Sequence, residues 1–132
     1  MNRLIFSILI TGIGVLLPAC SSQVTLHETF GEVTFNGKPI PTGDIKFSPE
    51  DKQLGSHAGK IENGKFSLKA REGKYKVQIT ATKMEPVPKG QEGAMGEKEA
   101  PVDYIPEIYN TKTTLTATVP SSGPLKFELK AE

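Results

Sequence analysis

The sequence predicts an all-β protein, a small seven-stranded antiparallel β-sandwich, and three observations indicate it. From Thr29 onwards apolar and polar residues alternate with period two, which places every second side chain on one face of a strand. Two Asn-Gly pairs, at 36–37 and 63–64, fall between such runs, and Asn-Gly is the preferred pair for type I′ hairpin turns. No segment after residue 19 offers a convincing amphipathic helix.

The seven expected strands are each apolar on one face. They centre on residues 33–35, 45–47, 56–62, 66–68, 75–81, 115–119 and 125–129. Packed face to face as two antiparallel sheets, they should share one core formed by Phe66, Val77, Ile79, Leu115 and Phe127. The chain has a single cysteine, so no internal disulfide is available and apolar burial must supply most of the stability.

Residues 1–19 predict a secretory signal peptide. Arg3 precedes an apolar run of about 14 residues, 4–17, which is shorter than the roughly 20 residues of a membrane-spanning helix. The run ends in Leu-Pro-Ala-Cys, and this ending resembles the lipobox of bacterial lipoproteins. The resemblance implies cleavage before Cys20, a diacylglyceryl thioether on its sulfur and acylation of the new amino terminus.

The predicted organisation is therefore a signal peptide, a lipidated tether over 20–28, and a domain over 29–132 with a long loop at 84–110. Several acyl chains on Cys20 would hold the protein firmly on a membrane. We expect it in the cell envelope, on the periplasmic or the surface-exposed side of a bacterial membrane. Ordinary secretion with a free thiol, or a buried thiol at Cys20, is the alternative.

Charge and composition exclude one class of partner. The chain has 16 Lys and Arg against 15 Asp and Glu, and Arg3 lies in the expected signal peptide. A protein this close to neutral has no basic excess for phosphate backbones. We therefore expect no nucleic-acid binding.

Three segments combine a turn or glycine motif with an alternating strand: 31–41, which opens Gly-Glu-Val-Thr-Phe-Asn-Gly, 59–68 around the second Asn-Gly, and 73–79, which begins Gly-Lys-Tyr. Together they resemble carboxypeptidase regulatory-like domains, which have a transthyretin-like (prealbumin-like) fold related to Ig-like sandwiches. Residues 106–110 and 127–129 also resemble parts of a group of short bacterial lipoproteins built on this domain. The resemblance covers about 29–130 and implies a stand-alone, non-enzymatic module.

Few residues suggest catalysis or metal binding. His27 and His57 lack the spacing of a metal-binding pair, and we expect both to be exposed to solvent. Asp44, Glu50 and Asp51 do not follow the alternating ligands of a calcium loop. We therefore expect no enzyme, no metal and no cofactor; a hydrolase with an unrecognised site is the less favoured alternative.

The long loop at 84–110 is the most distinctive segment. Its first half, 84–99, is rich in Gly, Pro and charge and should bury little. Its second half is too apolar to remain in water, because it carries Tyr104, Ile105, Ile108 and Tyr109. These four residues either cap one end of the sandwich or form a partner-recognition loop.

The sequence thus favours a membrane-anchored binding or structural module whose partner is a cell-envelope protein or a glycan. A carbohydrate-binding module at the cell surface is the alternative. The absence of Trp weakens it, since sugar sites usually present flat aromatic rings.

Overall fold

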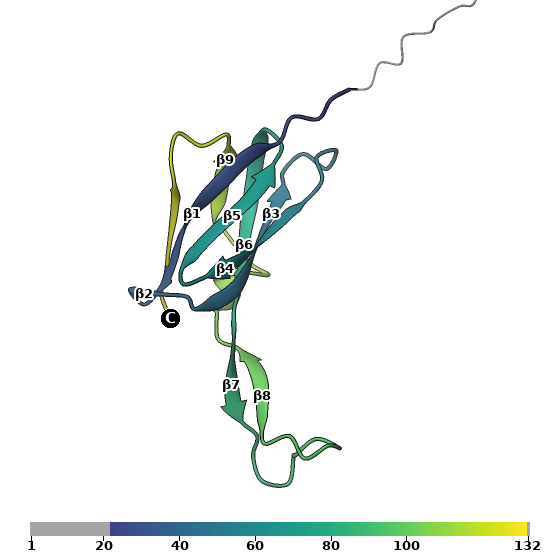
Figure 1. The fold of residues 1–132 in the computed structure, drawn as a ribbon, viewed down its shortest axis with the longest axis vertical. Coiled ribbons are helices and arrows are strands. Elements are labelled where there is room, and N and C mark those ends of the chain that lie inside the picture. Colours follow the sequence, from purple (N-terminus) through teal and green to yellow (C-terminus); the bar gives the residue numbers. More distant parts are fainter. Residues whose placement is uncertain (1–21, 132) are drawn as a thin grey trace, which may run out of the picture.

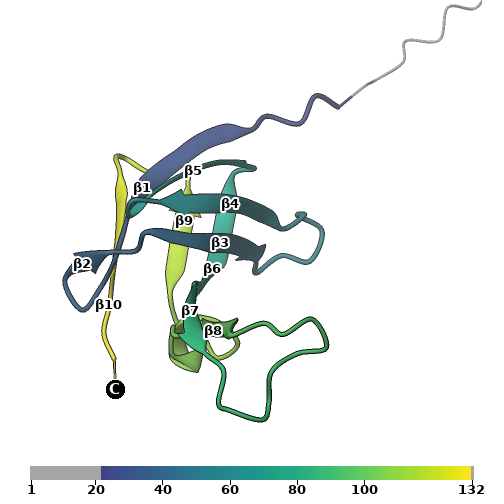
Figure 2. The same ribbon diagram turned by 60° about the horizontal axis from the view of Figure 1, so that its bottom comes forward.

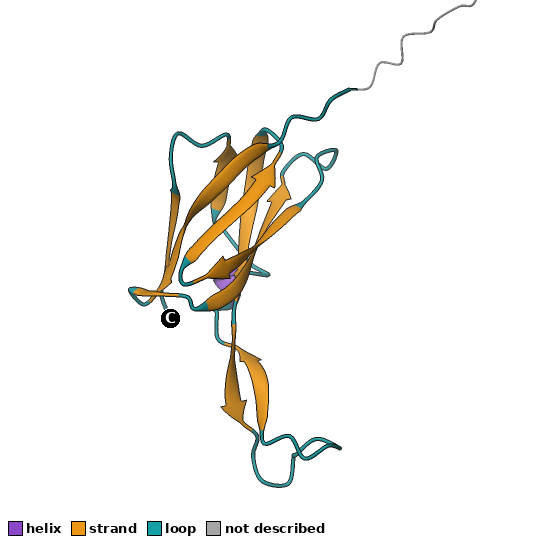
Figure 3. Cartoon of the chain, viewed as in Figure 1, coloured by secondary structure: helices purple, strands orange, loops and turns teal. Residues whose placement is uncertain are grey.

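A computed structural model of the chain describes residues 22–131. The expected signal peptide and Cys20 lie outside the described residues. The regular structure of the described part consists of strands and one short 3₁₀ helix, joined by loops and turns (Figure 3). In chain order its elements are β1 (His27–Phe35), β2 (Lys38–Pro39), β3 (Thr42–Pro49), β4 (His57–Glu62), β5 (Lys65–Ala70), β6 (Gly73–Thr80), β7 (Thr82–Pro86), β8 (Glu99–Asp103), the 3₁₀ helix η1 (Glu107–Tyr109), β9 (Thr116–Val119) and β10 (Leu125–Leu129).

One eight-stranded sheet, in the order β10-β1-β5-β4-β3-β6-β9 with β2 beside β1, forms the body of the molecule. It curls so that the strands at its two ends, β10 and β9, lie on the same side of the core (Figure 1, Figure 2). The predicted all-β sandwich is confirmed. All seven expected strands are present, and β2, β7 and β8 are added to them.

The pairing of β1 with β10 is parallel, from Gly31↔Leu125 to Phe35↔Leu129. Every other pair among the described strands is antiparallel, as expected. A parallel pair needs a long crossover, and here the intervening strands supply it. Gly31 permits the close approach of β10, because a Cβ atom built there would overlap the carbonyl oxygen of Leu125. The alternation of residues predicts the faces of a strand but not the direction of its neighbour.

Both Asn-Gly pairs form the expected hairpin turns. Asn36 and Gly37 have φ of 50° and 77°, and Asn63 and Gly64 have φ of 50° and 74°, the positive values that type I′ turns require. The paired residues that flank them are Phe35↔Lys38 and Glu62↔Lys65. These two-residue loops set the register of β1–β2 and β4–β5.

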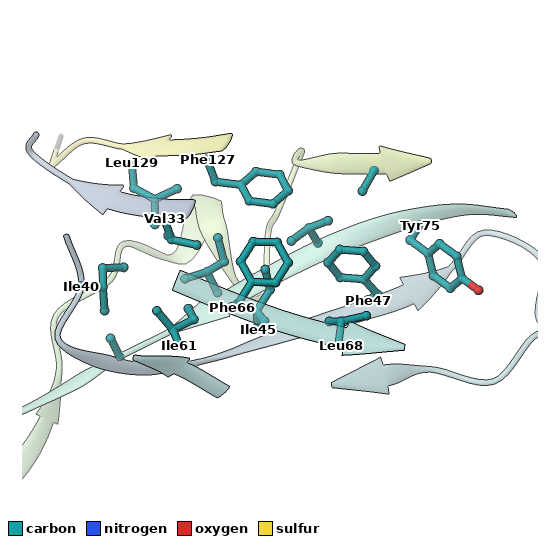
Figure 4. Close-up of a cluster of buried hydrophobic side chains, with 14 of the residues drawn as sticks. Val33, Ile40, Ile45, Phe47, Ile61, Phe66, Leu68, Tyr75, Phe127 and Leu129 are labelled. Atoms are coloured by element: carbon teal, nitrogen blue, oxygen red, sulfur yellow. The ribbon is translucent and has the colours of Figure 1, made fainter. Parts of the chain in front are cut away.

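The core lies on the inner face of the curled sheet, enclosed between its two halves (Figure 4). Phe66 of β5 and Phe127 of β10 meet across it with ring centroids 6.1 Å apart, and Val77 and Ile79 are fully buried. These four residues confirm the predicted core. Leu115 is partly buried and packs against this cluster, so it lies at the edge of the shared core, just before the short edge strand β9.

The described part of the tether is shorter than expected. β1 begins at His27 and pairs with β5 from His27↔Ala70 onwards, so the strand starts two residues before the predicted boundary at Thr29. Residues 22–26 are exposed and without regular structure. They leave the sandwich at the upper end in Figure 1.

Candidate functional site

The segment expected to be a long loop contains a β-hairpin that extends beyond the sandwich. Its strands β7 and β8 pair from Thr82↔Asp103 to Pro86↔Glu99 as a separate two-stranded sheet. The expectation of an irregular connection is wrong for 84–86 and 99–103. Sequence reasoning missed the hairpin because each strand is short, contains a proline and has little apolar alternation.

The hairpin and the tether leave the molecule at opposite ends. Both views show β7 and β8 at the end of the sandwich away from residues 22–26 (Figure 1, Figure 2). At the tip of the hairpin the side chain of Met95 is 90% exposed, and within its strands Met84 is 59% exposed. This end of the molecule therefore presents apolar side chains to solvent.

The four residues predicted to cap the sandwich or recognise a partner lie at the base of the hairpin. Ile105 is 5% exposed and belongs to the core. Tyr104 packs edge-on against Phe35, with centroids 5.5 Å apart, and burial raises the pKa of its phenol. Tyr109 packs against the core and its hydroxyl accepts a hydrogen bond from the Lys130 N–H at 3.1 Å. Ile108 is half-buried, so the packing that the cap interpretation predicts is present.

Three polar residues that sequence analysis did not single out hold this segment in place. The Asp103 carboxylate accepts a hydrogen bond from the Ile105 N–H at 3.0 Å, an Asx-type turn that an Asp two residues before an apolar position could have suggested. Asn110, 8% exposed, donates from its side-chain amide to the Ile105 carbonyl at 3.2 Å. The Gln78 amide on β6 donates to the Asn110 carbonyl at 3.2 Å. The segment is thereby joined to the sheet.

This attachment creates a groove on the outer face of the sheet, with a volume of about 450 Å³. Strand register aligns two rows of residues across β4, β3 and β6. One row is Lys60, Asp44 and Thr80, and the other is Ala58, Lys46 and Gln78. The lining consists of Asp44, Ile45, Lys46, Ala58, Gln78 and Thr80 from these strands, walled by Asp103, Asn110 and Thr111. Asp44 forms an ion pair with Lys60 beside the groove. Most of the accessible surface of the groove is apolar, and carboxylates, an amide, hydroxyls and an ammonium group supply its hydrogen-bonding groups.

The carboxylates considered for calcium are not brought together. Asp44 lies near the start of β3, whereas Glu50 and Asp51 follow its end, about 20 Å away along an extended strand. In the part of the chain that the structure describes, no group of three or more His, Cys, Asp or Glu residues could hold a metal ion.

The two histidines are half-buried, so their expected exposure is wrong. The His57 ring packs edge-on to Tyr75, with centroids 5.9 Å apart, and its Nε2 accepts from the Arg71 N–H at 3.4 Å. Burial, and then the nearby Arg71 guanidinium, lower the pKa of His57. Its ring therefore contacts Tyr75 of β6 across the intervening strand β3.

Comparison with protein-family models, with curated proteins and with solved structures found no match for the chain. Over residues 22–131, the structure contains no helix of the length and apolarity needed to cross a membrane.

Proposed function

We propose that the chain is a lipid-anchored protein of the bacterial cell envelope that acts as a non-enzymatic binding module. One observation carries the proposal: the tether and the hairpin leave the sandwich at opposite ends (Figure 1). An anchor on Cys20 would hold the start of β1 near a membrane. The groove and the hairpin would then face away from it.

The amino terminus supports the anchor. The apolar run of 4–17 ends in the lipobox-like sequence before Cys20, and residues 22–26 are exposed, as a tether requires. The likeness of 29–130 to carboxypeptidase regulatory-like modules supports a stand-alone module without catalysis. We propose membership of that family on these segments alone.

The groove combines a mostly apolar surface with a few hydrogen-bonding groups, which supports a cell-envelope protein or a glycan as the partner. Its lining offers the carboxylate of Asp103, the amide of Gln78 and the hydroxyls of Thr80 and Thr111. Such groups can hydrogen-bond the hydroxyls of a sugar or the backbone of a peptide. Among the described residues, no aromatic side chain lines the groove, so its lining offers no ring for stacking on a sugar.

Intact-mass measurement and detergent partitioning test the anchor. The wild-type protein should begin at an acylated Cys20 and enter the detergent phase, whereas Cys20→Ala should remain an uncleaved precursor or leave the membrane. A mature wild-type protein with an unmodified Cys20 would refute the proposal.

Site-specific photo-crosslinking in intact cells tests the orientation. A crosslinking residue at Met95, on the hairpin, should yield adducts with envelope components. The matched control is Lys69, an exposed residue on β5 that pairs with Glu28 near the tether. Equal adducts at both positions would contradict a partner surface at the hairpin end.

A further inference from the structure

The hydrogen-bond pattern of the hairpin shows which backbone groups point outward. The Tyr104 N–H donates to the Ala81 carbonyl at 3.1 Å, and the Val87 N–H donates to the Lys98 carbonyl at 2.9 Å. Hydrogen-bonded pairs alternate with non-bonded pairs along an antiparallel ladder. The bonded pairs therefore include residues 83 and 85 of β7, and the backbone groups of residues 82, 84 and 86 face away from β8.

The two outer edges of the hairpin differ. On β8 the middle outward-facing position is Pro101, opposite Met84, and a proline has no N–H to offer another strand. On β7 the outward N–H groups of Thr82 and Met84 are present, and only Pro86, at the end of the strand, lacks one. The pairing of β3 with β6 ends at Asp44↔Thr80, and β8 is the one strand paired with β7 among the described residues.

The sequence of β7 is complementary to itself. If two copies of the strand lie antiparallel and centred on Met84, Lys83 of each copy stands opposite the partner's Glu85. Within one chain these side chains already form an ion pair at 2.7 Å, with 55% and 44% of their surfaces exposed. Two copies would thus place four alternating charges on one face, and opposite charges across strands stabilise a pair.

The backbone satisfies the same register. The two Met84 residues exchange both of their hydrogen bonds, and each Thr82 N–H meets the carbonyl of the partner's Pro86. Because Pro86 has no N–H, one hydrogen bond is missing at each end of the ladder. Four hydrogen bonds in total would join the copies.

We propose that the outer edge of β7 pairs with the same edge of a second copy, forming a four-stranded antiparallel sheet from two hairpins. The contact is short, so association is weak and depends on high local concentration. Because the paired strands are antiparallel, the two sandwiches lie at opposite ends of the shared sheet. If each copy is anchored through Cys20, as proposed above, the pair joins copies on two membrane surfaces that face each other. The pairing itself does not depend on the anchor.

Disulfide trapping tests the register. The full chain, with Cys20→Ser so that no other thiol remains, carries Met84→Cys and is oxidised in detergent solution. Directly opposed residues of a hydrogen-bonded pair have Cα atoms about 5.5 Å apart, which is within the range of a disulfide. Met84→Cys should form a covalent dimer at least about tenfold faster than Met95→Cys or Val102→Cys, two exposed hairpin positions away from the proposed contact.

Charge exchange tests the partner. In the Met84→Cys background, Lys83→Glu should slow dimer formation several-fold by opposing like charges. Adding Glu85→Lys should restore it, because the double exchange is again self-complementary. Equal rates at positions 84, 95 and 102, or no recovery in the double variant, would overturn the proposal. Thermal melts of the variants at positions 83, 84, 85, 95 and 102 check that each one folds. Because Cys20 is replaced in all of them, the result does not depend on lipidation.

Discussion

The sandwich and the hairpin end are stabilised by different interactions. In the sandwich, alternating strands bury a continuous cluster in which Val33, Ile45 and Phe47 have no exposed surface. In the hairpin, Met84 and Val102 stay exposed, and backbone hydrogen bonds hold the two strands. Apolar burial thus supplies most of the stability where apolar and polar residues alternate, and hydrogen bonds supply most of it where they do not. The exposed end therefore has the freedom to serve a partner.

The largest expected effect is in the core. Truncating Phe66 or Phe127 to Ala should lower the free energy of unfolding by about 3–5 kcal/mol, because buried aromatic contacts are lost and a cavity is left. Lys76→Ala and Lys126→Ala, on the exposed face, should change it by less than about 0.5 kcal/mol. Denaturant melts measure both. The reverse order would mean that the faces of these strands are exchanged.

The contact between β1 and β10 gives the next effect. Gly31→Ala should lower the free energy of unfolding by about 1–3 kcal/mol, because the new methyl group meets the Leu125 backbone carbonyl, which cannot move without displacing β10. Gly55→Ala is the matched control, since a Cβ there has nothing within 4 Å. If the two variants melt alike, the close parallel pairing is wrong.

The base and the tip of the hairpin should respond differently to change. Replacing 87–97 with a short Gly-Ser linker should alter stability by only about 1 kcal/mol, because loop-closure entropy varies slowly with length. Replacing Tyr104 and Tyr109 together with Ser should cost several times more, because the contact with Phe35 and the packing on the core are lost. Denaturant melts of the two variants make the comparison. If the tyrosine variant melts like wild type, Tyr104 and Tyr109 do not stabilise the fold, and partner recognition is the better interpretation of these two rings.

The same contrast explains how much could be predicted from the sequence. Period-two alternation and two Asn-Gly pairs sufficed for seven strands and for two turns, since local residue types determine both. The parallel β1–β10 pair could not be predicted, because it joins strands far apart in the chain. The groove wall also escaped prediction, since Gln78 and Asn110 meet only after folding. Local patterns carry the fold, whereas the candidate site depends on long-range contacts.

The smallest expected effect is the pH dependence due to His57. Burial and Arg71 hold its pKa below the usual value of 6.5 in the folded protein, so the unfolded chain binds the proton more readily. Its contribution to stability should therefore be complete above about pH 6.5 and decline as the pH falls through the lowered pKa. His57→Gln offers an acceptor to the Arg71 N–H without titrating. Denaturant melts between pH 7.5 and 5.5 should show a steeper loss of stability in wild type than in this variant, and equal slopes would mean that His57 titrates alike in both states.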